Sequence, residues 1–178
     1  MKWSIWVALL LVGCAKPLTN PAAPFKGKEP ISLLHYSLLD SLRQGPVLVL
    51  FLPRDCVGSA EVKPFVNLVS KGYKDRLQVL ALYAGTDLQT AEWIKAQRPD
   101  FVTIPDWDAT FTKRYSLTAG PAAALVDRDS NIIKQWPSLA RTQWLEINTE
   151  IARLLKSEPA KIDLNSAPEQ PPTPCAYP

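Results

Sequence analysis

The sequence is poor in the residue types that build most metal and cofactor sites. It has one histidine, three cysteines and seven glycines among 178 residues. His35, in the segment SLLHYSLL, has no cysteine or acidic cluster beside it, so a surface or packing role is favoured over metal binding or base catalysis. The sequence contains no glycine-rich phosphate loop, zinc-type spacing or Ser-His-Asp arrangement. We therefore expect no metal and no cofactor.

Charge of a single sign is also scarce. The formal net charge is +3 and the basic residues are scattered, so the sequence does not indicate a nucleic-acid partner. The length of 178 residues, 47% of them hydrophobic, fits one globular domain with an ordinary core.

The chain has no apolar run as long as a membrane-spanning helix, which needs about 20 residues. The run over residues 5–12 follows the positive Lys2 and precedes small residues, so residues 1–13 are predicted to be an export signal. The letters LVGC that end at Cys14 resemble the bacterial lipobox. This resemblance implies cleavage before Cys14, lipidation of that cysteine and a tether to a membrane facing the periplasm. The alternative is a plain secretory signal.

The residues that follow the lipobox bear on which membrane holds the protein. Ala15 and Lys16 come directly after Cys14, where an aspartate is absent. By resemblance to enterobacterial lipoproteins, this favours the outer membrane.

Proline, in contrast, is abundant, and it is concentrated near the two ends of the chain. Of the 17 prolines, several fall in residues 14–30 and several in residues 157–178. These compositions predict a flexible linker after Cys14 and a disordered C-terminal tail. A compact domain is expected between them, over residues 31–156.

The middle of the chain alternates between buried strands and amphipathic helices. The patterns predict strands at 46–52 and 76–85, helices at 59–72, 87–97 and 108–116, a hairpin at 122–136 with its turn at 127–130, and a helix at 142–157. A strand-helix-strand crossover requires a parallel pair and a hairpin an antiparallel pair. We therefore expect a single α/β domain with a central mixed sheet flanked by helices.

Cys56 marks a joint between a predicted strand and a predicted helix. In the segment CVGSAEVKP, Cys56, Ser59, Glu61 and Pro64 have the spacing of the active-site segment of thioredoxin-like proteins. The chain resembles the extracytoplasmic thiol–disulfide reductase and redoxin branch of that family over residues 31–156.

A second segment, TAGPAAALVDRDSNII, carries the same resemblance further along the chain. It implies a cis peptide bond before Pro121, with this proline lying against Cys56. The resemblance thus implies a thioredoxin-like fold, with Cys56, Ser59 and Pro121 at the catalytic site.

Several residues depart from the family pattern. Ser59 stands where the second cysteine of C-x-x-C is expected, and Asp55 stands where the family has tryptophan. The peroxidatic motif P-x-x-x-T-x-x-C would place proline and threonine at the positions of Val49 and Pro53, so that signature is absent. These departures leave the fold assignment intact and leave the chemistry open.

Cys56 is predicted at the start of a helix, where the helix dipole favours a thiolate by about 0.3–1 kcal/mol. Asp55 opposes this effect, while Arg54 and Lys63 assist it if they turn toward the sulfur. Ser59 forms no disulfide, but its hydroxyl is placed one helical turn on, where it could donate a hydrogen bond to the Cys56 thiolate.

Cys175 provides a second thiol in the predicted tail. An extended tail of this length reaches about 60 Å at ~3.1 Å per residue, so reach does not exclude a bond to Cys56. Cys175 is therefore a possible resolving cysteine. The favoured interpretation is a free or intermolecular thiol on a disordered segment.

Three functions remain open at this point. The first is a membrane-tethered thiol–disulfide oxidoreductase or peroxiredoxin-like antioxidant with Cys56 as its single nucleophile. It would act on protein thiols, disulfides or peroxide, with release by an external thiol. The second is a non-catalytic binding module that holds extended peptide in the groove between Cys56 and Pro121. The third is a two-thiol enzyme in which Cys175 resolves Cys56.

Overall fold

A computed structural model describes residues 44–178 of the protein. Its strands are β1 (Val47–Leu52), β2 (Gln78–Tyr83), β3 (Val102–Pro105), β4 (Ala119–Gly120), β5 (Ala122–Val126), β6 (Ile132–Trp136) and β7 (Cys175–Ala176). Its helices are α2 (Val57–Glu61), α3 (Lys63–Gly72), α4 (Asp87–Gln97), the 3-10 turn η1 (Trp107–Ala109), α5 (Thr110–Arg114) and α6 (Arg141–Leu154).

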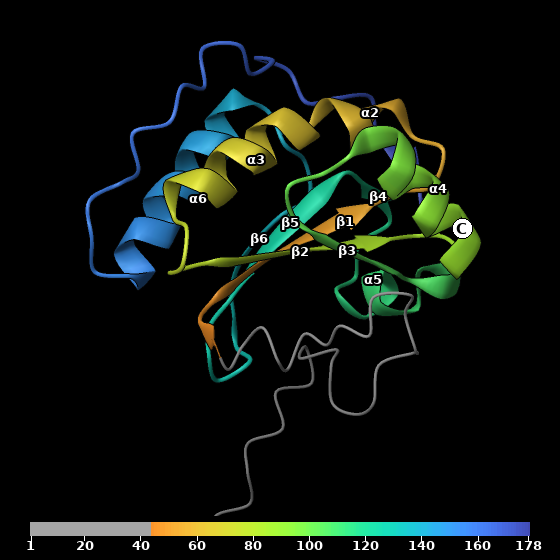
Figure 1. Ribbon diagram of the computed structural model, residues 1–178, viewed down its shortest axis with the longest axis horizontal. Helices are drawn as coiled ribbons and strands as arrows, with labels where there is room; N and C mark the ends of the chain where they lie inside the picture. Colours follow the sequence, from red (N-terminus) through yellow and green to blue (C-terminus); the bar gives the residue numbers. More distant parts are fainter. Residues whose placement is uncertain (1–43) are drawn as a thin grey trace, which may run out of the picture.

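Five strands form the central sheet in the order β3-β2-β1-β5-β6. The pairs β1–β2 and β2–β3 are parallel, whereas β5 runs antiparallel to both β1 and β6. Helices α3, α4 and α6 lie over one face of this sheet, and α5 lies under the other (Figure 1). The predicted thioredoxin-like fold, with its mixed sheet flanked by helices, is confirmed.

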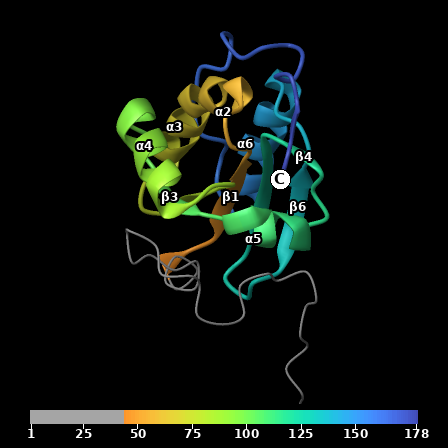
Figure 2. The same cartoon turned by 90° about the vertical axis from the view of Figure 1, so that its right-hand side faces the viewer.

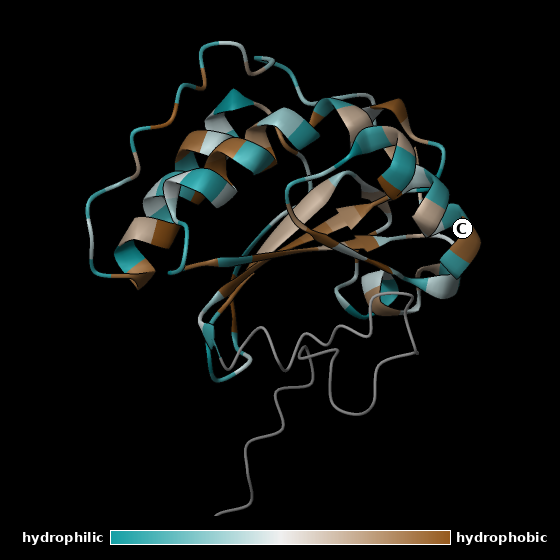
Figure 3. Ribbon diagram, in the orientation of Figure 1, coloured by the Kyte–Doolittle hydropathy of each residue, from teal (hydrophilic) through white to brown (hydrophobic). Residues whose placement is uncertain are grey.

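Strand β1 is central because it is apolar on both faces. All six of its residues are fully buried, and the central strands are the most hydrophobic part of the ribbon (Figure 3). Alternate side chains enter two separate cores, so that Leu50 faces α3 and α6 while Phe51 faces α5. A strand buried on both faces is expected to lack hydrophobic alternation, which is what the sequence shows.

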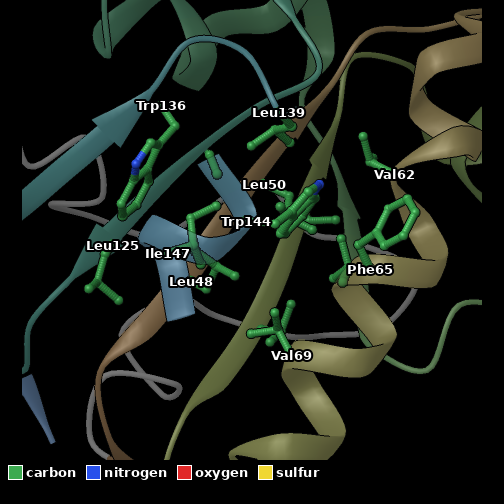
Figure 4. Packing of buried hydrophobic residues seen from close by; sticks show 14 of the residues in the cluster. Leu48, Leu50, Val62, Phe65, Val69, Leu125, Trp136, Leu139, Trp144 and Ile147 are labelled. Atoms are coloured by element: carbon green, nitrogen blue, oxygen red, sulfur yellow. The ribbon is translucent and has the colours of Figure 1, made fainter. Parts of the chain in front are cut away.

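Trp144 fills the core between α3 and α6. It projects from α6 toward Phe65 of α3, whose ring centroid lies 6.0 Å away (Figure 4). Ile147 and Ile151 continue the same buried stripe at helical spacing, and all three α6 side chains are 0% exposed. The amphipathic helix predicted here is therefore confirmed, although it begins at Arg141 and ends at Leu154.

The predicted helix over 59–72 is two helices in the structure. Helix α2 ends at Glu61, and α3 begins at Lys63 with Pro64 in its first turn. Proline has no N–H to donate and is well tolerated at a helix start. Pro64 therefore lies in the first turn of a new helix rather than inside one continuous helix. Strand β3 was not predicted, although Val102, Thr103 and Ile104 have the β-branched side chains typical of strands.

The hairpin between β5 and β6 closes where the sequence predicts it. The backbone N–H of Ser130 donates to the carbonyl of Asp127, and the Asp127 carboxylate accepts from the backbone N–H groups of Asp129 and Asn131. Ser130 adopts a φ of 66°, a left-handed conformation that usually favours glycine. The Asp127 side chain thus closes the turn without a glycine at this position.

The proline-rich tail is ordered, contrary to the expectation of disorder. It leaves α6, crosses the helical face and reaches the end of the sheet where α2 begins (Figure 1). Leu164 and Ala167 are 5% and 0% exposed, so the tail contributes side chains to the core. Composition missed this because a few apolar residues scattered through a polar, proline-rich segment give no periodic signal.

Polar contacts from α6 and from Tyr73, at the end of α3, fix the course of the tail. The Arg141 side chain donates to the carbonyls of Asn165 and Ala167 at 2.7 and 2.9 Å. Asn148 Nδ2 donates to the carbonyl of Ala160, whose own N–H donates to the hydroxyl of Tyr73. These partners satisfy backbone groups that no regular structure pairs, which explains how an irregular segment stays docked.

Candidate functional site

The two cysteines in the described part of the chain form a disulfide. Cys56 and Cys175 are 119 residues apart in sequence, and their sulfurs are 1.97 Å apart with a Cα–Cα distance of 6.0 Å. The favoured interpretation of Cys175 as a free or intermolecular thiol is therefore wrong for this structure. The docked tail brings Cys175 to the end of β1. The length of the tail allows this approach, but the sequence alone favoured a thiol that is not bonded to Cys56.

Cys56 is the N-cap residue of α2. It has an extended backbone with φ −98° and ψ 123°, and only 7% of the residue is exposed. Asp55 before it adopts a φ of 54° and directs its N–H toward the hydroxyl of Tyr83, 3.5 Å away. This turn carries the chain out of the buried strand and places Cys56 just beyond the carboxyl end of β1.

The Ser59 side chain does not serve Cys56. It is 1% exposed, and its hydroxyl donates to the carbonyl of Pro53 at 2.9 Å. The hydrogen bond from Ser59 to Cys56 that the sequence left open is thus replaced by one that closes the strand-to-helix turn. This serine lies within α2 rather than capping it.

The two cations near Cys56 in sequence have other partners. Lys63 donates from its ammonium group to the carbonyl of Gln97 at 2.7 Å, and Arg54 lies 3.4 Å from the Asp55 carboxylate. The Cys56 sulfur lies 4.0 Å from the carbonyl oxygen of Thr173. The oxidised structure therefore gives no support to stabilisation of a Cys56 thiolate by Lys63 or Arg54.

Pro121 lies at the site as expected, and its peptide bond to Gly120 is cis. Gly58 packs closely against both Pro121 and the tail. A Cβ on Gly58 would lie 3.0 Å from Cδ of Pro121 and 3.0 Å from Cβ of Pro172. Only glycine fits this position without displacing its neighbours, so α2, the cis-proline loop and the tail meet here.

The end of the tail adds a short strand to the cis-proline loop. Strand β7 pairs antiparallel with β4, so that Gly120 lies opposite Cys175 and Ala119 opposite Ala176. Figure 2 shows the tail descending beside β4 to the C-terminus. The disulfide is thus accompanied by backbone pairing rather than being the tail's only attachment.

Tyr177 anchors this strand. Its hydroxyl donates to the carbonyl of Phe51 at 3.0 Å, and its ring packs against the core on the α5 side of the sheet. Burial raises the pKa of the Tyr177 phenol well above its ordinary value, and the charge of Asp106 adds to this effect. The phenol therefore remains protonated and a donor at physiological pH.

Asp106 is a buried carboxylate near this anchor. It is 0% exposed, and it accepts hydrogen bonds from the backbone N–H groups of Phe111 and Thr112 and from the Thr112 hydroxyl. The Asp106 carboxylate thus satisfies backbone N–H groups in the first turn of α5, whose N-cap residue, Ala109, offers no side-chain cap. Asp106 and Asp108 lie so close in sequence that they could not be told apart without the backbone geometry.

A family comparison now decides what kind of protein this is. The Redoxin family matches residues 26–137, which is more than half of the chain. The chain belongs to the redoxin family. This redoxin is therefore a thiol–disulfide oxidoreductase or a peroxiredoxin-like enzyme. The tail with Cys175 lies beyond the matched residues, so the family match does not account for it.

Solved structures share the fold at low sequence identity. A putative thiol:disulfide interchange protein DsbE from Chlorobium tepidum matches with a TM-score of 0.60 at 18% identity, covering 66% of this redoxin and 84% of its own chain. A putative thioredoxin from Neisseria meningitidis also gives 0.60 at 18%, covering 73% and 90%.

A third solved structure comes from the peroxide-reducing side of the fold. The bacterioferritin comigratory protein of Xanthomonas campestris gives a TM-score of 0.58 at 10% identity, covering 67% of this redoxin and 85% of its own chain. A search of curated protein sequences finds no match.

The predicted export signal, the lipidated Cys14, the linker over 14–30 and His35 all lie outside the described residues. Within residues 44–178, no helix is both long and apolar enough to cross a membrane.

Proposed function

We propose that this redoxin is a two-cysteine thiol–disulfide oxidoreductase, with Cys56 as the nucleophile and Cys175 as the resolving cysteine. The disulfide between them carries the proposal. It lies at the start of α2, beside the cis peptide bond before Pro121. Ser59 has no sulfur and is already bonded to Pro53, so Cys175 takes the role that the second cysteine of a C-x-x-C motif would have.

The reductive half of the cycle can be written from these two thiols. The Cys56 thiolate attacks one sulfur of a substrate disulfide, forming a mixed disulfide and releasing the first substrate thiolate. The Cys175 thiolate then attacks the Cys56 sulfur, which forms the bond seen here and releases the second substrate thiolate. Two electrons pass to the substrate, and its two thiolates take up protons from the solvent. A dithiol reductant must then reduce the Cys56–Cys175 bond.

Protein disulfides are the better supported substrates, compared with peroxides. In the peroxidatic motif, a proline and a threonine precede the cysteine, whereas this redoxin has Val49 and Pro53 at those positions. Val49 is fully buried in β1 and Pro53 offers its carbonyl to Ser59, so neither supplies a side-chain donor for a peroxide. In contrast, β4 pairs with the extended tail strand β7, which supports an extended polypeptide as the substrate.

Mixed-disulfide trapping tests the proposal. In the Cys175→Ser variant the second step is blocked, so we expect a mixed disulfide between Cys56 and a protein substrate to accumulate on non-reducing gels. The Cys56→Ser variant is the matched control and should trap nothing. A failure of Cys175→Ser to trap more than wild type, with equal turnover of an insulin disulfide assay, would contradict a resolving role for Cys175.

The same variants separate an enzyme from a binding module. If wild type neither reduces a protein disulfide nor oxidises a protein dithiol, and Cys56→Ser retains full partner binding, the non-catalytic alternative replaces this proposal. A peroxide-consumption assay on wild type provides the third comparison, and we expect much slower turnover with peroxide than with a protein disulfide.

We further propose that the protein is exported and lipid-anchored through Cys14, facing the periplasm from the outer membrane. The lipobox-like LVGC segment supports the anchor, and a disulfide supports an oxidising compartment. Mass spectrometry of the mature N-terminus should find an acylated Cys14. Cys14→Ala should yield a protein that is released from membranes, whereas recovery of wild type in the soluble fraction would contradict the anchor.

A further inference from the structure

Any substrate that forms a mixed disulfide with Cys56 must bring its sulfur to the place that Cys175 occupies here. Cys175, which is bonded to Cys56, lies opposite Gly120 of β4, and the preceding tail residues Pro172 and Thr173 pass close to Gly58. The segment of the tail that lies in this space is therefore a guide to what a substrate chain meets there. This reasoning rests on the proposed role of Cys56 as nucleophile.

The tail residue that fits most tightly beyond the cysteine is Tyr177. Its hydroxyl donates to the carbonyl of Phe51, and its ring packs against the core on the α5 side of the sheet. A Cβ on Gly120 would overlap the Tyr177 hydroxyl, so the glycine leaves room for this side chain. Ala176, which lies between Cys175 and Tyr177 in the sequence, is exposed. Because side chains alternate along a strand, Cys175 and Tyr177 point to one side of β7 and Ala176 to the other.

We propose that the space held by Tyr177 is a substrate subsite, which accepts an aromatic side chain two residues C-terminal to the cysteine that reacts with Cys56. The subsite consists of the Phe51 carbonyl as acceptor, the bare Gly120 backbone and the apolar surface beside them. In the oxidised protein the tail fills the subsite. Reduction of the disulfide removes the covalent tether, and an extended substrate strand then pairs with β4 in its place.

The same geometry makes tail and substrate mutually exclusive. Both would pair with the β4 edge, which offers only the short run of backbone groups of Ala119 and Gly120. When Cys175 attacks the mixed disulfide, the returning tail displaces the substrate strand as the new sulfur–sulfur bond forms. The oxidised product therefore has no free subsite, and the substrate is released with its cysteine reduced.

Peptides without cysteine test the subsite separately from the redox chemistry. The probe is a fluorescent octapeptide with the sequence of residues 171–178, in which serine replaces Cys175. It is titrated by anisotropy into the full chain carrying Cys175→Ser and Tyr177→Ala, whose own tail cannot fill the subsite. Two matched peptides carry alanine in place of Tyr177, or the residues at 176 and 177 exchanged, which keeps the composition and moves the aromatic ring to the other side of the strand.

We expect the tyrosine peptide to bind roughly tenfold or more tightly than the alanine peptide, because burial of an aromatic ring and its hydrogen bond contribute together. The exchanged peptide should bind no better than the alanine peptide. A phenylalanine peptide should bind about fivefold more weakly than the tyrosine peptide, since it lacks the hydroxyl that Phe51 accepts. Oxidised wild type should bind none of the four.

Gly120→Ala in the same background provides a check on the location of the subsite. It should abolish the preference for tyrosine, while circular dichroism and labelling of Cys56 by iodoacetamide report whether the fold and the thiol remain intact. If Gly120→Ala does not fold, the comparison among the four peptides still decides the matter.

Equal binding of the tyrosine, alanine and exchanged peptides would overturn the subsite, as would the absence of any binding. Tight binding of the tyrosine peptide to oxidised wild type would overturn the exclusion by the tail. These outcomes are independent of mixed-disulfide trapping. A redoxin that traps substrates but shows no aromatic preference keeps the proposed function and loses the subsite, and the reverse result keeps only the binding surface.

Discussion

At the scale of single residues, the site depends on a few buried polar groups whose partners the sequence did not reveal. Ser59 and Asp106 are 1% and 0% exposed, and each closes a turn at the end of a strand. Sequence spacing placed Ser59 at the motif correctly but suggested the wrong acceptor for its hydroxyl. A hydroxyl bonds to the acceptor that the local backbone presents, and spacing alone does not define that acceptor.

Ser59→Ala should destabilise the protein modestly and leave its redox chemistry intact. The buried carbonyl of Pro53 loses its hydroxyl donor, which costs about 1–2 kcal/mol. Urea unfolding of the oxidised protein measures this cost. Ser157→Ala, whose hydroxyl bond lies at the surface, is the control and should change little. A large loss of disulfide-reducing activity in Ser59→Ala would instead mean that the serine acts on Cys56.

Asp106→Asn should cost more than Asp108→Asn. In Asp106→Asn an amide N–H₂ faces donors of Thr112, and the charge-assisted hydrogen bonds at the start of α5 are lost, for about 2–3 kcal/mol. Asp108 is exposed with a φ of 53°, a conformation that asparagine tolerates well. Thermal unfolding of both variants makes the comparison, and equal midpoints would show that Asp106 contributes no more than its exposed neighbour.

At the scale of elements, the regular part of the fold could be predicted and the irregular part could not. Strand β1, helix α4, helix α6 and the β5–β6 hairpin lie where hydrophobic period and turn residues indicated. Strands β3, β4 and β7 were missed because they have four residues or fewer. A period cannot be read from so short a segment, and β4 and β7 form only because the tail docks.

Arg141 holds the tail to the domain, so its removal should expose the tail. Arg141→Ala deletes the donors to Asn165 and Ala167. We expect trypsin to cleave oxidised Arg141→Ala after Lys161 several-fold faster than wild type, because cleavage of a docked segment requires local opening. Arg153→Ala is the matched control, since Arg153 pairs with Glu150 on its own helix. Identical cleavage rates in wild type and Arg141→Ala would show that other contacts suffice.

At the scale of the whole molecule, one covalent bond ties the last residues of the chain to the start of α2, just after the central strand. The disulfide spans 119 residues, which encloses most of the described domain in a single loop. Closing so long a loop restricts the unfolded chain, and the chain-entropy account gives about 5 kcal/mol of stabilisation. Oxidation is therefore expected to stabilise the fold as well as to fill the site.

Guanidinium unfolding of oxidised wild type and of Cys175→Ser should differ by up to about 5 kcal/mol, the oxidised form being more stable. Wild type treated with a reductant should match Cys175→Ser. If the reduced and oxidised forms unfold at the same denaturant concentration, the tail contributes equally to stability whether or not it is tethered. That result would contradict release of the tail on reduction.

The sequence by itself determined the thioredoxin-like order of elements, the place of Cys56 before a helix and the identity of Pro121 as the cis-proline. The order of elements follows from the local hydrophobic period, whereas the places of Cys56 and Pro121 follow from the resemblance of their segments to those of thioredoxin-like proteins. The partner of Cys56 was decided only by the tertiary structure. Cys175 reaches it because Arg141, Asn148 and Tyr73 hold an irregular tail along the helices, and such long-range contacts leave no periodic trace in the sequence.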